Sequence, residues 1–304
     1  MKPLMTLFSA GLLMSTCALA VRPARAAPSP QSDQSVSHSH QQDGQGQGDE
    51  VTPGCQKIYN AITTVPGATL YDKLGKAMTD GATLHKGLPL RQWGAIVDRN
   101  GIVCAVVTSG GPGNTDLNAQ WLGSRVIAAQ KANTVNDFST TTLALSTANL
   151  YAATQPGGSL YGLQFSNPVS TDAAYGDNRN CDSVGCDSTE APRYGQRDDP
   201  LVGHYVGGVN VFGGGLALYD SSGQLVGGLG TSGNTSCADH YISWVIRHTL
   251  GLDYVPTMIT GRDDNIIFPA SAGASPTGFE QPLCGIDPDE PNYPAELEKN
   301  YMPK

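Results

Sequence analysis

The residues with the clearest chemical potential lie between 207 and 240, in the stretch GGVNVFGGGLALYDSSGQLVGGLGTSGNTSCADH. Glycines at this density let a backbone or a flat ligand approach the chain closely. Gly230 and Gly233 enclose a turn, and Ser236 and Asp239 follow at the spacing of a capping box, which predicts the start of a helix. The junction between this turn and the helix is therefore the best candidate for a binding site.

Histidines that could bind a metal ion stand around this junction. His240, Trp244 and His248 recur every four residues and share one face of the predicted helix. The two histidines would lie about 12 Å apart, too far to hold one metal ion together, although a flat cofactor could stack beside them. The periodicity favours an amphipathic helix with these residues half-exposed. His85 and His204 border other predicted elements and could also ligate iron, but an isolated histidine is more often structural.

Common catalytic motifs are missing from the sequence. The glycines of 227–233 lack the lysine of a P-loop and the spacing of a dinucleotide-binding loop, and no G-x-S-x-G or H-E-x-x-H pattern occurs. No C-x-x-C pair is present, which disfavours thiol-redox chemistry and a zinc ribbon. A hydrolase triad of Asp239 and His240 with Ser232 or Ser236 is disfavoured, because capping explains the aspartate. The residues alone predict a pocket but no reaction.

Composition divides the chain into four parts. An apolar run near the N-terminus, preceded by a lysine and followed by small residues, predicts an export signal over 1–26; a retained anchor is the alternative. Residues 27–50 are polar and predict a disordered linker, in which two histidines are solvated. A folded domain is expected over 51–286, with its core at 92–252, followed by an acidic tail at 287–304.

After removal of the export signal the chain has six cysteines, at positions 55, 104, 181, 186, 237 and 284. An even number in an exported protein favours disulfides, with fifteen possible pairings. Cys181 and Cys186 share a short polar loop and are the first choice of pair. Cys104 lies in an apolar run and could instead be a buried thiol.

Charge restricts the partners that the chain can bind. The formal net charge is −9 and only 15% of the residues are charged. No basic stripe is present, which argues against nucleic acid, and an acidic exterior disfavours anionic membranes. The composition is typical of a secreted or periplasmic globular protein.

Two β-rich ribbons with helices between them predict an α+β fold. Asn100 and Gly101 separate two apolar runs, which is a strong hairpin signal. In chain order the elements are helix or turns at 56–85, strands at 92–98 and 102–108, helices at 118–137 and 143–154, a long loop at 161–205, a second strand pair at 207–229 and a helix to about 250. This order predicts an antiparallel sheet covered by helices on one face.

The sequence resembles the GlcG/HbpS family of haem-binding proteins, and the haem-degrading domain at the C-terminus of a propanediol-utilisation adenosyltransferase. The resemblance covers most of residues 93–252. The segments that carry it are DRNG at 98–101, SRVIAAQKANTVNDFS at 124–139, ALSTANLYAATQPGGSLYGLQ at 144–164, the glycines at 207–208, 223, 227–228, 230 and 233, and Asp239. Each segment is a weak motif by itself, but their order and spacing together are specific.

The resemblance implies a profilin-like fold, in which helices flank a five-stranded antiparallel sheet. The long loop would then be an insertion into a single domain, and the residues after Gly251 a C-terminal extension. Family members bind haem or other tetrapyrroles and tend to form homo-oligomers. Some bind iron through a histidine in the first helix, and His85 is the histidine near the equivalent region of this chain.

The expected site combines the glycine-rich junction with the histidines around it. Glycines would contact the flat porphyrin, and a histidine would bind the haem iron. The candidate cofactor-binding residues are His85, His204, Gly207, Gly208, Gly230, Gly233, Asp239 and His240, with His85 and His240 as the candidate iron ligands.

The leading hypothesis is an exported haem-binding protein, periplasmic or secreted, that sequesters, delivers or senses haem. Binding is favoured over turnover, because the sequence identifies no general acid or base. One alternative is an enzyme that degrades haem or modifies another cofactor. The other is an extracytoplasmic assembly or interaction module that binds no cofactor.

Overall fold

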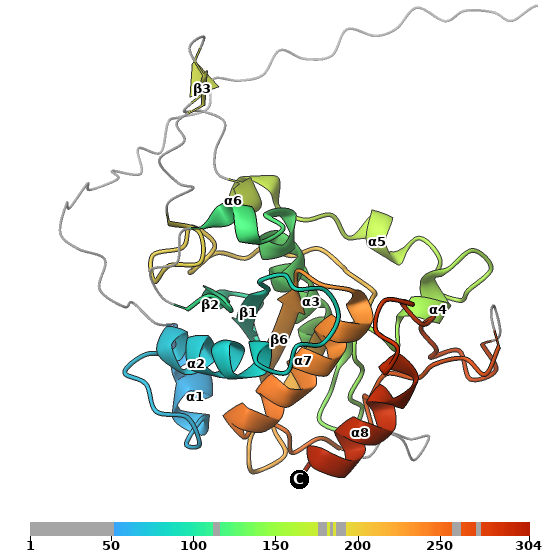
Figure 1. Ribbon diagram of the computed structural model, residues 1–304. Coiled ribbons are helices and arrows are strands. Elements are labelled where there is room, and N and C mark those ends of the chain that lie inside the picture. Colours follow the sequence, from blue (N-terminus) through green and yellow to red (C-terminus); the bar gives the residue numbers. More distant parts are fainter. Residues whose placement is uncertain are drawn as a thin grey trace, which may run out of the picture. The chain divides into compact units, whose positions relative to one another are not determined.

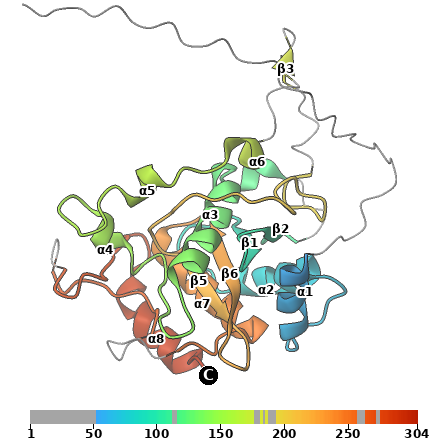
Figure 2. The same cartoon turned by 180° about the vertical axis from the view of Figure 1, so that it is seen from behind.

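A four-stranded antiparallel sheet lies at the centre of the fold, with its strands in the order β2-β1-β6-β5 (Figures 1 and 2). The strands are β1 (Trp93–Asp98), β2 (Val103–Thr108), β5 (Gly215–Tyr219) and β6 (Leu225–Ser232). Both expected hairpins form, β1-β2 around Gly101 and β5-β6 around Gly223. Each of these glycines has a positive φ, at 80° and 73°, which a tight turn requires.

The computed structural model describes residues 52–111, 116–175, 181–182, 185–186, 193–256, 263–271 and 275–304. All of them belong to one unit, Asp49–Lys304. The expected export signal at 1–26 and linker at 27–50 lie outside the described residues. Among the described helices, none is both long and apolar enough to span a membrane.

Helices cover both faces of the sheet. The helix α3 (Gly123–Phe138) packs against β1, β5 and β6 on one face. The other face carries α1 (Pro53–Ala61), α2 (Leu70–Ala82) and α7 (Ser236–Leu250), as the views from the two sides show (Figures 1 and 2). The prediction of helices on one face only was wrong, because the central strands bury side chains on both of their faces.

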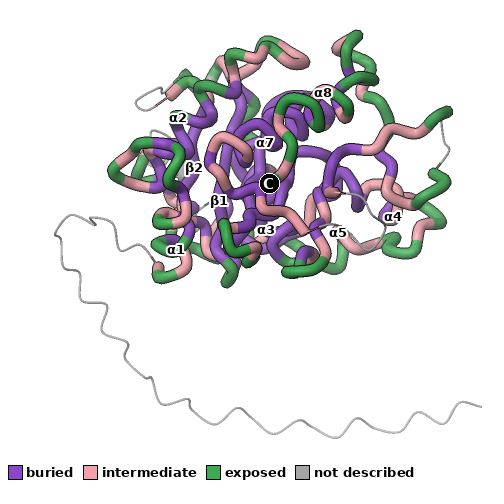
Figure 3. Tube along the Cα trace, turned by 90° about the horizontal axis from the view of Figure 1, so that it is seen from below, coloured by how far each residue is buried: buried purple, intermediate pink, exposed green. Residues whose placement is uncertain are grey.

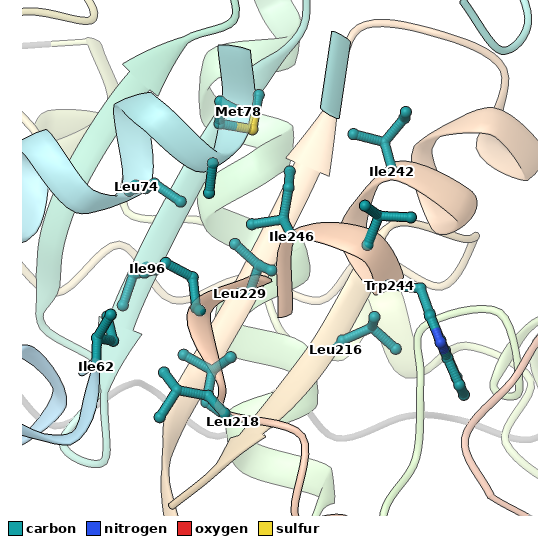
Figure 4. Packing of buried hydrophobic residues seen from close by; sticks show 14 of the residues in the cluster. Ile62, Leu74, Met78, Ile96, Leu216, Leu218, Leu229, Ile242, Trp244 and Ile246 are labelled. Atoms are coloured by element: carbon teal, nitrogen blue, oxygen red, sulfur yellow. The ribbon is translucent and has the colours of Figure 1, made fainter. Parts of the chain in front are cut away.

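The alternation of side chains along β1 divides the core in two. Ile96 belongs to the larger cluster, between the sheet and α2 and α7 (Figure 4). Its neighbours there include Leu74, Met78, Leu216, Leu218, Leu229, Ile242 and Ile246. Trp93, Ala95 and Val97 point to the opposite face, where they meet alanines of α3. Figure 3 shows that buried residues concentrate along these strands and helices.

The backbone of α3 lies unusually close to β6. A Cβ atom at Gly230 would collide with the carbonyl oxygen of Ala128, and one at Gly228 with that of Ala132. The helix can approach this far because both strand positions lack a side chain. The glycine-rich run therefore makes room for a helix of the protein's own core at these two positions.

We expect Gly230→Ala to destabilise the protein by about 3 kcal/mol, since the added methyl group overpacks the contact with α3. Gly123→Ala is the matched control, because a Cβ atom there meets no atom within 4 Å. Urea unfolding followed by tryptophan fluorescence measures both variants. Equal stability of the two variants would contradict this account of the glycines.

The fifth strand expected from the resemblance is missing from the described residues. The stretch at 205–211 makes only isolated bridges, Ile102 with Tyr205 and Val169 with Gly207. Gly207 and Gly208 have φ values of 63° and 80°, and this left-handed backbone interrupts an extended strand. The prediction of a strand at the start of the glycine-rich stretch was wrong for this reason.

The helix expected at 143–154 is reduced to its last turn, α4 (Tyr151–Thr154). Upstream of it, the Ser146 and Asn149 side chains bond each other's backbone amide groups at 3.0 and 3.2 Å. Such local side-chain bonds compete with helical hydrogen bonds. The apolar spacing was therefore a poor predictor of helix in this segment.

Short elements occupy the long loop and the C-terminal region. They are η1 (Leu117–Ala119), α5 (Leu163–Ser166), α6 (Thr171–Tyr175), β3 (Cys181–Asp182), β4 (Gly185–Cys186), η4 (Glu290–Asn292) and α8 (Tyr293–Asn300). A buried ion pair between Arg125 of α3 and Asp199 fastens the end of the long loop. Acidic composition predicted a tail after 287, but Tyr293 and Leu297 are fully buried in the larger cluster, so α8 completes the core.

Two disulfides join distant segments, Cys55 with Cys104 and Cys237 with Cys284. The interpretation of Cys104 as a buried thiol was therefore wrong. In the β3-β4 pair, Cys181 stands opposite Cys186 in register. Their side chains lie outside the described part of the chain, so the expected disulfide between them stays a prediction.

Candidate functional site

A buried ion pair lies where β6 ends and α7 begins. Lys131 Nζ is 2.9 Å from Asp239 Oδ2, and both side chains are almost completely buried. Lys131 Nζ also donates to the carbonyl oxygen of Thr231 at 2.9 Å, and Gln92 Nε2 donates to Asp239 Oδ1 at 2.9 Å. The pair joins α3 on one face of the sheet to α7 on the other.

Burial favours the neutral forms of both Lys131 and Asp239. It raises the pKa of Asp239 and lowers the pKa of Lys131, while each partner's charge opposes that shift. The bonds from Gln92 and from the backbone also favour the carboxylate of Asp239. A charged pair with these additional hydrogen bonds fixes the start of α7 in one position.

The cap of α7 differs from the expected capping box. Thr235 is the N-cap residue, and its hydroxyl oxygen accepts from the amide of Ala238 at 3.2 Å. Ser236 is therefore already inside the helix. Asp239 instead accepts from the amide of Asn234 at 3.1 Å, in the turn before the helix. The prediction of a helix start was confirmed, but the residue that caps it was wrong.

Asn234 attaches the segment that holds His85 to this helix start. Its side-chain oxygen accepts from the amide of Leu88 at 2.8 Å, and its Nδ2 donates to the carbonyl oxygen of the same residue at 2.8 Å. Gly87, with a φ of 71°, lies against Asn234 and Ala238 with no room for a side chain. His85 is exposed and has a φ of 51°. The structure thus attaches the segment that carries His85 to the start of α7 through Leu88.

A surface hollow of about 290 Å³ borders the same segment. It is lined by Leu283, Gly285, Ile286, Asp287, Pro288, Glu290 and Pro291. The amide of Gly87 donates to Asp287 Oδ2 at 3.4 Å, which ties the His85 segment to the hollow. The helix start, the His85 segment and the hollow together are called the α7-start region below.

His240 is inside the protein. Its exposed fraction is 0%, and its Nε2 accepts from the amide of Ile266 at 3.0 Å. Burial lowers the pKa of His240 from 6.5 to about 3, so the ring is neutral at pH 7. Among the described residues, none forms a hydrogen bond with its Nδ1. A ligand could reach this imidazole only if the segment around 266 moved away.

The burial of His240 predicts a loss of stability in acid. Between pH 6.5 and about 3, His240 binds a proton in the unfolded chain but stays neutral in the folded protein. The free energy of unfolding therefore falls by up to about 1.4 kcal/mol for each unit by which the pH is lowered. The contribution is fully present above pH 6.5. His240→Gln keeps an acceptor for Ile266 and should flatten this slope by close to one proton, as measured by urea unfolding between pH 7 and 4. An unchanged slope would contradict the assignment.

His204, Gly207 and Gly208 lie at the other end of β1. The amide of Val103 donates to the carbonyl oxygen of His204 at 3.0 Å, next to the β1-β2 turn, and His204 is exposed. The ring of Tyr205 lies beside both Gly101 and Gly207, and Gly208 lies against Gln130 of α3. These residues do not join the α7-start region.

Gly230, in β6, and Gly233, directly after this strand, have different surroundings. Gly233 has a φ of 126° and lies against Arg91 and Gln92, at the beginning of β1 and beside the α7 start. Gly230 faces the backbone of α3. The structure therefore places Gly233, Asp239 and the segment that carries His85 around the α7 start, and His204 and its neighbours at the β1-β2 turn.

The sequence did not predict the roles of Lys131, Gln92 and Asn234. Lys131 follows Ala128 by three residues, so the two side chains share one side of the helix, and Ala128 is buried. A lysine at such a position indicates a buried anionic partner, because an unpaired buried charge is costly. The partner itself could not be identified, since Asp239 is 108 residues away.

Lys131→Met should cost about 3–5 kcal/mol of stability, because it leaves the Asp239 carboxylate buried without its cation. The double variant with Asp239→Leu should lose clearly less than the sum of the two single variants. Chemical unfolding of the four proteins of this cycle gives the coupling energy. Additive losses would show that the two residues do not act as a pair.

Comparison with known proteins identifies the domain. Residues 115–244 match the family model described as haem degrading protein HbpS-like. This segment, which is less than half of the chain, is similar to HbpS-like proteins. The matched residues include α3, β5, β6 and most of α7, so they hold both the Lys131–Asp239 pair and the glycines of β6. The resemblance seen in the sequence is confirmed, and no curated protein matches the chain.

Two solved structures resemble the chain at low similarity. Protein ORFY of Klebsiella pneumoniae is 19% identical, with a TM-score of 0.37, and the match covers 59% of this chain and 85% of that chain. The PduOC:heme complex is 23% identical, with a TM-score of 0.35, and the match covers 58% and 88% of the two chains. These values are too low to locate a site in the present chain.

Proposed function

We propose that this protein binds haem and is exported to the periplasm or the medium, where it sequesters, delivers or senses haem. The observation that carries the proposal is the position of His85, an exposed imidazole on a segment bonded both to the α7 start and to an apolar hollow. The HbpS-like match over 115–244 supports haem as the ligand, since the family is described by its action on haem.

The hollow offers the kind of surface that a porphyrin ring needs. Leu283 and Ile286 are 46% and 52% exposed, and two prolines complete its apolar walls. Its volume is at the low end for ligand sites, so a porphyrin would hold one edge in the hollow and leave the rest against the surface. A histidine side chain is a common ligand of haem iron.

The remaining histidines fit this role less well. His204 is exposed but lies at the β1-β2 turn, away from the hollow. His240 is buried, and His248 Nδ1 is 2.7 Å from Asp253 Oδ2. Among the histidines of the described residues, His85 is therefore the first candidate for the iron ligand and His204 the second.

Export is supported by chain composition and by cysteine pairing. Two disulfides are typical of an oxidising compartment, and the expected signal over 1–26 would direct the chain there. Homo-oligomerisation and the profilin-like arrangement that the resemblance implies belong to the same proposal.

Haemin titration of the chain from Ala27 onward tests the proposal, with bovine albumin as the non-specific control. We expect a saturable, stoichiometric shift of the Soret band that is tighter than the control. His85→Ala should abolish or shift this band, while His204→Ala and the matched control His248→Ala should leave it unchanged. A linear, featureless titration would overturn haem binding and favour the assembly module. Loss in His204→Ala alone would move the site to the β1-β2 turn.

Haem turnover is the alternative that the description of the family raises. It predicts that bound haem disappears under a reductant and oxygen faster than free haem does, with catalase present. The same preparation and the same absorbance measurement follow this reaction. Stable bound haem would leave sequestration, delivery or sensing as the function.

A further inference from the structure

Three atoms that commonly bind metal ions converge beside the first turn of α7. Cys237 Sγ, Cys284 Sγ and a carboxylate oxygen of Glu290 all lie within 4.8 Å of one another, and the two sulfurs form a disulfide. We propose that reduction of this disulfide opens a site for a thiophilic divalent cation such as Zn²⁺, with these three residues as its ligands. The proposal does not depend on haem binding.

Glu290 is the residue that distinguishes this cluster from an ordinary structural disulfide. Its exposed fraction is 1%, and among the described residues no lysine, arginine or histidine forms an ion pair with it. Its oxygens accept from the amides of Gly285 at 2.7 Å and Asp287 at 3.4 Å, so each oxygen keeps a free lone pair. A buried carboxylate without a cation is costly, and a bound metal ion would offset that cost.

The helix favours the thiolate form of the cysteine on the loop. The amide of Cys237, in the first turn of the 15-residue α7, donates to Cys284 Sγ at 3.1 Å. Amide donors and the positive end of a helix stabilise a thiolate, which is the form that binds metal ions. Two sulfurs and one oxygen are a ligand set that zinc accepts, with a fourth position left for water.

A metal ion also has a route to these ligands. Glu290 and Gly285 line the hollow described above, and Cys284 is partly exposed beside them. Cys237 is completely buried behind them. An ion that enters the hollow would therefore meet Glu290 and Cys284 first.

The chain contains a second cluster that serves as a comparison. The ligand atoms of Cys55, Cys104 and Asp98 also lie within 4.8 Å of one another, and these two sulfurs form a disulfide of their own. Asp98, however, already accepts three hydrogen bonds, from the Thr52 hydroxyl at 2.9 Å and from two amides at 2.8 and 3.1 Å. Its carboxylate is engaged in holding the β1-β2 turn, and so it is a poorer metal ligand than Glu290.

Reduction of the disulfide requires an external dithiol as the reductant. The dithiol gives two electrons and two protons to the Cys237–Cys284 disulfide, which becomes two thiols, and is itself oxidised to a disulfide. Binding of the divalent cation then releases the two thiol protons to water. The oxidised protein has no thiolate at this position and should not bind the ion there.

Cobalt titration tests the site, since Co²⁺ bound to thiolates has intense charge-transfer absorption. The protein is reduced with a dithiol, freed of it without oxygen, titrated with Co²⁺ and then with Zn²⁺. We expect one Co²⁺ per chain, displacement by Zn²⁺, and no such absorption from the oxidised protein. Absence of the absorption in the reduced protein would overturn the proposal.

Variants assign the ligands. Glu290→Gln keeps all cysteines and should weaken Co²⁺ binding at least about tenfold. Loss of a residue that only hydrogen-bonds to a metal ligand already weakens binding by about this factor, and loss of a ligand should cost at least as much. Cys284→Ser should abolish the thiolate absorption. The double variant Cys55→Ser with Cys104→Ser is the matched control and should bind Co²⁺ like the wild type. Binding that survives Glu290→Gln unchanged, or is lost in the control while circular dichroism shows a folded protein, would overturn the proposal.

Discussion

The close contact between α3 and the glycines of β6 positions the rest of the candidate site. No side chain separates the backbone of Ala128 and Ala132 from the strand. The helix therefore lies close enough to the sheet for Lys131 to reach the end of β6. There its ammonium group meets Asp239 of α7, a helix on the opposite face. Asp239 in turn orders the turn at Asn234, and Asn234 holds the His85 segment. One packing constraint between a helix and a strand is thus transmitted by hydrogen bonds to the surface.

This chain of contacts changes the meaning of the glycine-rich stretch. Glycines in such a run allow close contact either with a ligand or with another part of the protein's own backbone. The sequence pattern is the same in both cases and does not distinguish them. In this fold Gly228 and Gly230 admit α3, while Gly233 turns the chain toward α7. The hollow at residues 283–291 lies beyond these glycines, where Asp287 accepts from the amide of Gly87.

Local patterns in the sequence predicted the elements that local forces determine. Both tight hairpins and the helices α3 and α7 follow from turn residues and from periodicity, and the structure contains them. The number of strands could not be predicted, because the left-handed backbone of Gly207 and Gly208 depends on their surroundings. The site was predictable only in part. The type and spacing of Asp239 marked the junction, but its partner Lys131 and the burial of His240 beneath residue 266 depend on contacts between distant segments.

The four strands of the sheet come from distant parts of the chain, so the segment that matches the HbpS-like family does not contain the whole sheet. Residues 115–244 contain β5 and β6 but neither β1 nor β2, which supply the other half of the sheet. The segment also stops before the last turn and a half of α7 and leaves out α8, whose Tyr293 and Leu297 close the core. A protein cut at those limits would expose β6 as an unpaired edge, which is a template for aggregation. The folding unit is therefore Asp49–Lys304, and the match at 115–244 covers only part of it.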